Sequence, residues 1–393
     1  MSESVPGLAP EVFAPVEAPV SPSRASEEVE FVQLLTPEGE RVEHPDYAFE
    51  LDDDVIKGFY RDMTLVRRID TEATALQRQG ELGLWASLLG QEAAQIGSGR
   101  ALNAKDMVFP TYREHGVAWC QGVDPLRLLG LFRGVDQGGW DPKDNNFHLY
   151  TIVIGAQTLH ATGYAMGQQR DHAIGDAENG EATIAYFGDG ASSQGDVNEA
   201  FIWASVFNAP VVFFCQNNQW AISEPIDRQT RIPLYQRAAG FGFPGVRVDG
   251  NDVLATYAVT QQALKRAREG SGPTLVEAYT YRMGAHTTSD DPTKYRLSED
   301  LEYWKLKDPI ERVKAYLIRT GAADPGFFDE IDAEAVAIAS RLREGCLSMP
   351  DPALTEFFDH VYDEQTPQLA EQQKQYAAYA ASFGDAEDAA GER

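Results

Sequence analysis

Residues 181–223 read EATIAYFGDGASSQGDVNEAFIWASVFNAPVVFFCQNNQWAIS, and this stretch decides the fold that we expect for the chain. Its apolar run 183–187 is rich in β-branched and aromatic residues, which predicts a buried strand. A second apolar run, 210–215, predicts another strand. Between the two runs, apolar residues recur at helical spacing: Val197, Phe201, Ala204 and Phe207. The strand, helix and strand are long enough for a right-handed parallel crossover.

Polar residues follow each of these two strands. Gly188, Asp189 and Gly190 come after the first, and Asn217 and Asn218 after the second. Because open α/β sheets bind ligands at the carboxyl ends of their strands, we expect Asp189 and Asn218 to lie close together. Magnesium takes carboxylate, amide and carbonyl oxygens together with phosphate oxygens, and flanking glycines let a phosphate approach the backbone. The pattern predicts a magnesium–diphosphate site, although Gly-Asp-Gly by itself is more often a plain turn.

The alternation of strands and helices continues along the chain. Helical periodicity predicts helices at 52–79 and 253–268, and apolar runs predict strands at 245–249 and 274–281. Strands that alternate with helices in this way are typical of a doubly wound parallel sheet, so we expect an α/β fold.

Two further segments carry residues suited to an anionic ligand. Arg113 follows Tyr112 after an extended segment, and its planar guanidinium can grip a phosphate, although surface arginines are common. His286 lies in the loop 282–296, which also contains Arg282 and follows a predicted strand. A histidine has an intrinsic pKa near neutrality, so it can hydrogen-bond a phosphate or move a proton. A lone loop histidine is more often simply solvated.

Gly-Asp-Gly followed by Asn-Asn resembles the thiamine-diphosphate motif. Other segments narrow the resemblance to the α subunit of the E1 component of heterotetrameric 2-oxo acid dehydrogenases. These segments are YREHG (112–116), IGAQ (154–157), FGFPGVRVDG (241–250) and YRMGAHTTSDDPTKYR (281–296). The resemblance extends from about residue 45 to about residue 365. It implies the thiamine-diphosphate-binding fold, with thiamine diphosphate and Mg²⁺ as cofactors.

The resemblance also implies roles for individual residues. It assigns magnesium binding to Asp189, Asn218 and the carbonyl of Trp220, and a catalytic role to His286. The wider cofactor site that it implies consists of Tyr112, Arg113, Ile152, Ile154, Gly188, Asp189, Gly190, Ala191, Asn218, Trp220, Arg282 and His286. In the family a serine beside this histidine is phosphorylated in mitochondrial members; here that position is Thr287.

The resemblance implies partners as well. The cofactor needs a carboxylate at its aminopyrimidine ring, and we place no glutamate of this chain there; in the family it comes from the β subunit of an α2β2 tetramer. A 2-oxo acid is the implied substrate, and the lipoylated E2 acyltransferase receives the acyl group. Gln216 and the IGAQ segment favour pyruvate, whereas the segment 360–369 resembles branched-chain (2-oxoisovalerate) enzymes. An acetoin dehydrogenase α subunit and a non-catalytic, partner-binding subunit are further alternatives.

Composition narrows the partners and the compartment. The chain has 393 residues and a net charge of −28, which argues against nucleic acid as a partner. No apolar run approaches the ~20 residues of a membrane span, and we see no secretory signal. Three cysteines lack any CxxC or disulfide-framework spacing, so we expect reduced thiols and a cytoplasmic protein.

The domain organisation expected from composition and resemblance has three parts. Residues 1–28 are rich in Pro, Ala and Glu, which predicts a disordered N-terminal arm. Residues 29–383 form the E1 α domain, with helical additions at 45–105 and 301–365. Residues 384–393 are expected to form a flexible tail.

Overall fold

The computed structural model describes residues 31–47, 51–136 and 139–390. Within these ranges the centre is a parallel sheet of five strands in the order β1-β2-β3-β7-β6. The strands are β1 (Met107–Phe109), β2 (Thr183–Gly188), β3 (Val211–Asn217), β6 (Gly245–Asp249) and β7 (Thr274–Tyr279). The prediction of a parallel α/β sheet is confirmed.

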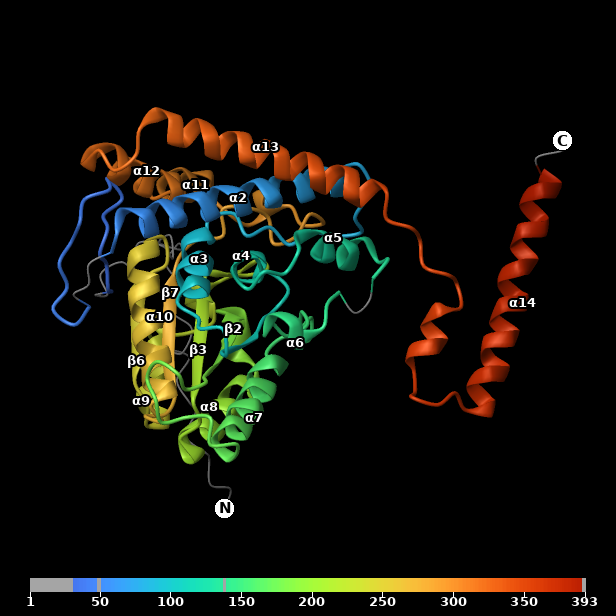
Figure 1. Ribbon diagram of the computed structural model, residues 1–393, viewed down its shortest axis with the longest axis horizontal. Helices are drawn as coiled ribbons and strands as arrows, with labels where there is room; N and C mark the ends of the chain where they lie inside the picture. Colours follow the sequence, from blue (N-terminus) through green and yellow to red (C-terminus); the bar gives the residue numbers. More distant parts are fainter. Residues whose placement is uncertain (1–30, 48–50, 137–138, 391–393) are drawn as a thin grey trace, which may run out of the picture.

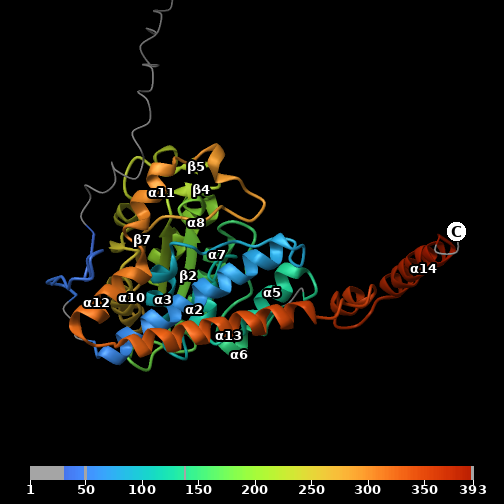
Figure 2. The ribbon, with the colours of Figure 1, turned by 90° about the horizontal axis from the view of Figure 1, so that it is seen from above.

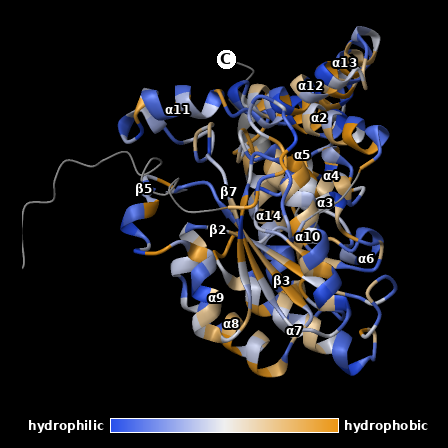
Figure 3. Ribbon diagram, turned by 90° about the vertical axis from the view of Figure 1, so that its left-hand side faces the viewer, coloured by the Kyte–Doolittle hydropathy of each residue, from blue (hydrophilic) through white to orange (hydrophobic). Residues whose placement is uncertain are grey.

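Helices cover both faces of this sheet (Figure 1). One hydrophobic cluster joins Ile184, Tyr186 and Phe214 to the helices on one face, which are α2 (Asp53–Arg78), α3 (Glu92–Arg100) and α10 (Val253–Arg268). A second cluster joins Ala185 and Phe213 to the helices on the other face, which are α7 (Ala156–Arg170), α8 (Gly195–Phe207) and α9 (Arg237–Phe241). Since β2 and β3 are buried on both sides, their sequences are almost continuously apolar (Figure 3).

The remaining elements surround this core. Figure 1 shows α13 lying along α2 at one end of the sheet, and the two helices are in contact. The other helices and the small hairpin are α4 (His115–Cys120), α5 (Pro125–Arg133), α6 (Pro142–Asn145), α11 (Ser298–Lys305), α12 (Pro309–Thr320), α13 (Pro325–Leu347), α14 (Pro367–Ala390), β4 (Trp220–Ala221) and β5 (Glu224–Pro225). Short 3-10 turns are η1 (Gly190–Ser193), η2 (Ile226–Arg228), η3 (Leu234–Gln236), η4 (Pro292–Lys294) and η5 (Glu356–His360).

The C-terminal end differs from the expectation. Helix α14 stands away from the body of the molecule (Figures 1 and 2) and runs to Ala390, into the segment 384–393 that we expected to be a flexible tail. The expected N-terminal arm, 1–28, lies outside the described residues.

Two further properties concern the described residues. Cys120, Cys215 and Cys346 are free thiols, in agreement with the absence of a disulfide pattern. Among the helices of the described ranges, none combines the length and apolarity that crossing a lipid bilayer requires.

Close packing of α3 against α10 positions residues of the site described below. A Cβ on Gly97 of α3 would lie 2.0 Å from Thr256 Oγ1 and 2.8 Å from the Val253 carbonyl oxygen, both in α10. Only glycine allows this approach. The same helix carries Gln95, which donates to the carbonyl of Arg113 at 3.0 Å, so the helix contact also positions the residues of the site.

We predict that Gly97→Ala lowers the free energy of unfolding by about 1–3 kcal/mol, because the added methyl group overpacks the contact between α3 and α10. Urea denaturation measures the change. Gly163→Ala in α7 is the matched control, since a Cβ there meets nothing within 4 Å. The control should be neutral or slightly stabilising, and equal destabilisation by both substitutions would contradict the packing argument.

Candidate active site

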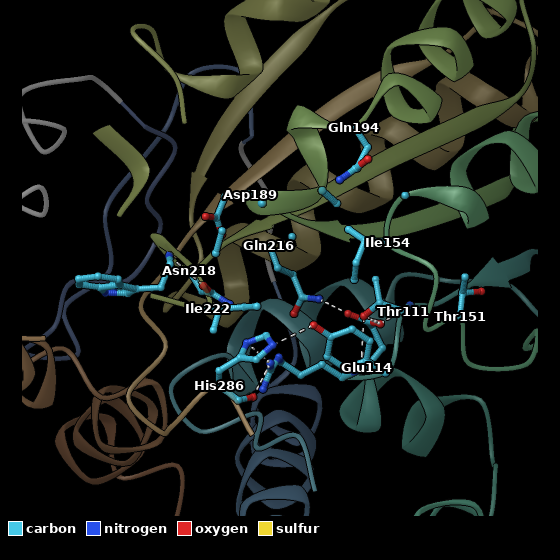
Figure 4. A pocket seen from close by; sticks show the side chains of 18 of the residues that line it. Thr111, Glu114, Thr151, Ile154, Asp189, Gln194, Gln216, Asn218, Ile222 and His286 are labelled. Atoms are coloured by element: carbon cyan, nitrogen blue, oxygen red, sulfur yellow. Dashed lines mark hydrogen bonds between the residues drawn. The ribbon is translucent and has the colours of Figure 1, made fainter. Parts of the chain in front are cut away.

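A cavity of about 300 Å³ lies where β2 and β3 end. Figure 4 shows Asp189, Asn218, Ile154 and His286 around this cavity. The residues expected from the sequence that line it are Tyr112, Arg113, Ile154, Gly188, Asp189, Gly190, Ala191, Asn218, Trp220 and His286. Ile152 and Arg282 are not among the lining residues. Ile152 follows the lining residue Thr151 and is 64% exposed, whereas Arg282 is fully buried and contacts His286 Nδ1 at 3.2 Å.

The first group of residues offers three kinds of oxygen. Asp189 is buried, its Oδ2 accepts from Gln229 Nε2 at 2.8 Å, and burial raises the pKa of its carboxyl to about 6. Asn218 donates to Gln91 Oε1 at 3.1 Å, which turns its own Oδ1 toward the Trp220 N–H, 3.2 Å away. The Trp220 carbonyl accepts from Arg282 at 3.2 Å. A carboxylate, an amide and a carbonyl are ligands for a hard cation such as Mg²⁺.

No cluster of three or more His, Cys, Asp or Glu side chains suited to a metal exists in the described part of the chain. The oxygens of Asp189, Asn218 and Trp220 therefore suit a cation that takes one carboxylate and completes its coordination with a ligand's own oxygens.

The second group surrounds His286. Its Nδ1 lies 3.3 Å from Arg113 Nη2 and 3.2 Å from Arg282 Nη1. Because a guanidinium only donates, Nδ1 must accept, and the imidazole hydrogen is on Nε2, 3.5 Å from Tyr112 Oη. Burial, together with both arginines, lowers the pKa of His286 to about 3, so the ring is neutral. Two guanidinium groups beside a neutral imidazole form a site for an anion.

The loop of His286 is held by its own side chains. Asp290 accepts from the His286 N–H at 2.8 Å and also from the Tyr295 hydroxyl, which accepts from Arg282 at 2.8 Å. The guanidinium of Arg296 donates to the carbonyl of Arg282 at 2.6 Å. These contacts fix Arg282 and His286 before any ligand binds.

The sequence reasoning missed several polar residues around the cavity. Glu114 is buried and accepts from Thr111 and from Gln216 Nε2, and burial raises the pKa of its carboxyl. Two glutamines that line the cavity each have a buried atom without a hydrogen-bond partner, Gln91 Nε2 and Gln157 Oε1. Such atoms normally have partners, so they indicate a polar ligand. Glutamines in GQEA and IGAQ carry no chemical signature, so only the fold reveals them.

His115 is a core residue rather than part of the site. Its Nδ1 accepts from Tyr150 Oη at 2.7 Å, its Nε2 donates to the Ala86 carbonyl at 2.8 Å, and burial lowers its pKa to about 3. Both nitrogens are satisfied away from the cavity.

The fold and the site define an α/β protein with carboxylate, amide and carbonyl oxygens near two guanidinium groups at the carboxyl edge of a parallel sheet. Residues 60–341, well over half of the chain, match the family model described as "Dehydrogenase E1 component". The chain belongs to this family.

Relatives with known names agree with this membership. The chain is 44% identical to the 3-methyl-2-oxobutanoate dehydrogenase subunit alpha of Mycobacterium tuberculosis H37Rv over 354 residues, which cover 90% of this chain and 95% of that protein. It is 38% identical to the pyruvate dehydrogenase E1 component subunit alpha of Acholeplasma laidlawii (81% and 92% covered). The corresponding subunit of Staphylococcus epidermidis RP62A is 36% identical (94% and 98% covered).

We predict that His286 stays neutral between pH 7 and pH 5, because burial and the two arginines lower its pKa to about 3. Replacing Arg113 by Gln removes one positive charge and should raise the pKa of His286. NMR of ¹³C-labelled histidine side chains measures both, with His286→Asn used to assign the signal. Titration of His286 near its usual pKa of ~6.5 in the unaltered protein would contradict the assigned environment.

Proposed function

We propose that this chain is the α subunit of the E1 component of a 2-oxo acid dehydrogenase. With thiamine diphosphate and Mg²⁺ it decarboxylates a 2-oxo acid, and the acyl group passes to the lipoyl group of an E2 acyltransferase. One observation carries the proposal: Asp189, Asn218, Arg113 and His286 line one cavity, and Arg282 contacts His286 Nδ1. A metal-bound diphosphate needs both kinds of site at once.

The residues fit this cofactor. A Cβ on Gly188 would meet nothing within 4 Å, so the space beside the strand end is free. Gln91 Nε2 and Gln157 Oε1 are buried without partners at the same cavity. The volume of about 300 Å³ is at the lower end of the range of ~300–1,000 Å³ usual for ligand pockets. A second polypeptide that completes the wall would enlarge it.

Each residue then has a role. Asp189, Asn218 and the Trp220 carbonyl would bind Mg²⁺, and Arg113, Arg282, Tyr112 and His286 would hold the diphosphate. Ile154 would pack against the aminopyrimidine ring. When bound, thiamine diphosphate supplies the carbon nucleophile and takes up the electrons released on decarboxylation. His286 is neutral, so it donates from Nε2 to an oxygen of the substrate or of the diphosphate rather than carrying a positive charge.

A β subunit is part of the proposal because the described residues that line the cavity include no free carboxylate. The carboxylates that line it are those of Asp189 and Glu114. Asp189 belongs to the proposed metal site, and both oxygens of Glu114 are hydrogen-bonded, one to Thr111 and the other to Gln216. The acid that the aminopyrimidine requires would come from the partner, in an α2β2 assembly.

Exposed apolar side chains support the same partner. Val153, at the cavity mouth, is 70% exposed, and Val206 of α8 is 73% exposed. Trp203 and Phe207 of α8 stack on each other while both remain partly exposed. Contiguous exposed apolar side chains of this kind mark protein–protein interfaces. Helices α7 and α8 both begin beside the cavity and pack together, so a partner on this surface would reach the cofactor.

For the substrate we place 3-methyl-2-oxobutanoate first and pyruvate second. The sequence segments around Gln216 favoured pyruvate, but the relative named for 3-methyl-2-oxobutanoate is 44% identical and those named for pyruvate are 36–38% identical. The two substrates differ by a few carbon atoms, which are worth only ~1–3 kcal/mol in a pocket. A cytoplasmic location remains a prediction from the sequence.

The proposal is tested by turnover of the chain co-purified with its β partner, with thiamine diphosphate, Mg²⁺ and an artificial electron acceptor. We expect decarboxylation, with 3-methyl-2-oxobutanoate preferred over pyruvate, and no activity of the α chain alone. Asp189→Ala should abolish cofactor binding. Activity with acetoin and with neither 2-oxo acid would show that acetoin is the substrate. A wild-type assembly that binds no thiamine diphosphate would favour a non-catalytic subunit.

We also predict that cation binding weakens as the pH falls through about 6. Burial raises the pKa of Asp189 to about 6. Below that pH, and without a cation, the Asp189 carboxyl is protonated, so a cation must displace the proton to bind. Below pH 6 the apparent affinity should fall roughly tenfold per pH unit. Electron paramagnetic resonance of Mn²⁺ without any phosphate ligand measures this. A decline that begins only near pH 4 would mean that the carboxyl has its ordinary pKa.

A further inference from the structure

Two glutamines outside the set expected from the sequence contact the side chains proposed as magnesium ligands. Gln229 Nε2 donates to Asp189 Oδ2 at 2.8 Å, and Gln91 Oε1 accepts from Asn218 Nδ2 at 3.1 Å. We propose that Gln91 and Gln229 are positioning residues that orient Asn218 and Asp189 for Mg²⁺ and thereby disfavour Ca²⁺. This inference rests on the proposed function, because it concerns the same site.

Gln229 restricts how Asp189 can bind a cation. Gln229 Nε2 donates to Oδ2, so a cation bound through a single oxygen of this carboxylate would take Oδ1. Mg²⁺ demands near-ideal octahedral geometry, whereas Ca²⁺ accepts flexible geometry and often takes both oxygens of one carboxylate. A carboxylate with one oxygen held by an amide is therefore directed to coordination through a single oxygen, which suits Mg²⁺.

Gln229 is itself held in place. Its backbone N–H donates to the Ile226 carbonyl at 3.0 Å, and its Nε2 also lies 3.3 Å from the Glu224 carbonyl oxygen. Glu224 belongs to β5, which pairs with β4, and β4 begins at Trp220. The hairpin thus couples the carboxylate of Asp189 to the strand that carries the Trp220 carbonyl. Gln229 Oε1 is buried without a partner, which leaves an acceptor for a water bound to the cation.

Gln91 decides which end of the Asn218 amide faces the cavity. Because Gln91 offers its Oε1, Asn218 must present its NH₂ group, and the Asn218 oxygen is turned the other way, toward the Trp220 N–H and the proposed cation. Gln91 is fully buried, and its backbone N–H donates to the Leu88 carbonyl at 2.8 Å. Gln91 lines the cavity and its Nε2 is buried without a hydrogen-bond partner, so we assign this group as a donor to a bound phosphate.

The test compares Mg²⁺ with Ca²⁺ in the assembled enzyme. Thiamine diphosphate is titrated in each metal, and the fluorescence of the chain, which has Trp220 in the cavity wall, reports binding. In Gln229→Met and Gln91→Ala, the apparent Kd in Mg²⁺ should rise by about 10–100-fold, as is usual when a residue behind a metal ligand is lost. The Kd in Ca²⁺ should rise much less, because Ca²⁺ tolerates poorly oriented ligands. A merely structural role would weaken both equally.

Two further variants separate positioning from general damage. Gln91→Glu keeps an acceptor for Asn218 but loses the donor toward phosphate, so it should weaken both metals while it keeps the preference for Mg²⁺. Gln168→Ala is the control: Gln168 is a buried glutamine of α7 that bonds to Thr183 at 2.9 Å and does not line the cavity. It should leave the ratio of the two Kd values unchanged.

The outcomes distinguish this inference from the proposed function. If the unaltered enzyme binds thiamine diphosphate in neither metal, the proposed function fails. If it binds and the ratio of the two Kd values is the same in Gln229→Met, Gln91→Ala and the unaltered enzyme, the positioning role is overturned and the function stands. Loss of the Mg²⁺ preference in Gln91→Glu as well would overturn the argument about the Asn218 amide.

Discussion

The parallel pairing of β2 with β3 is the constraint on which the site depends. Gly188 lies opposite Gln216 in the register, so the residues that follow, Asp189 on one strand and Asn218 on the other, leave the sheet at the same edge. A shift of one residue would turn every side chain of one strand to the other face. The close packing of particular side chains on each face opposes such a shift, because each face fits into its own hydrophobic cluster.

A second constraint comes from charge. Arg113 and Arg282 lie on either side of His286, and each lowers the pKa of that histidine. Burial and the charge of Arg113 also lower the pKa of Arg282 to about 10. The protein tolerates the two cations because carbonyl oxygens of the chain, such as that of Ser87 for Arg113 and that of Ile222 for Arg282, accept from them. Arg113 lines the cavity, so an anion bound there would relieve the repulsion between the two guanidinium groups.

Much of this arrangement could be predicted from the sequence, because it depends on patterns within short stretches of the chain. Continuous apolar runs fixed β2 and β3, and the period of 3.6 residues fixed α10 to the residue, Val253–Arg268. Asp189 and Asn218 were predictable because parallel strands end at the same edge. Gln91 and Gln229 were not, because each becomes significant only through a contact 40 or more residues away in the chain. The extent of α14 was missed because a polar composition was taken to exclude a helix.

The site is built as one part of a larger one. The side chains proposed for the cation and the anion are held by hydrogen bonds within this chain before anything binds. The surroundings of these side chains are more open, since Ile152 and Val153 are exposed close in the chain to the lining residues Thr151 and Ile154. The carboxylates that line the cavity, Asp189 and Glu114, already accept hydrogen bonds from this chain. The firmly held polar residues and the open, apolar rim would therefore have different tasks in the proposed function. In the proposed function, this chain would fix the charged end of the cofactor, and the surface that covers the rim would supply the acid and exclude water from the reacting end.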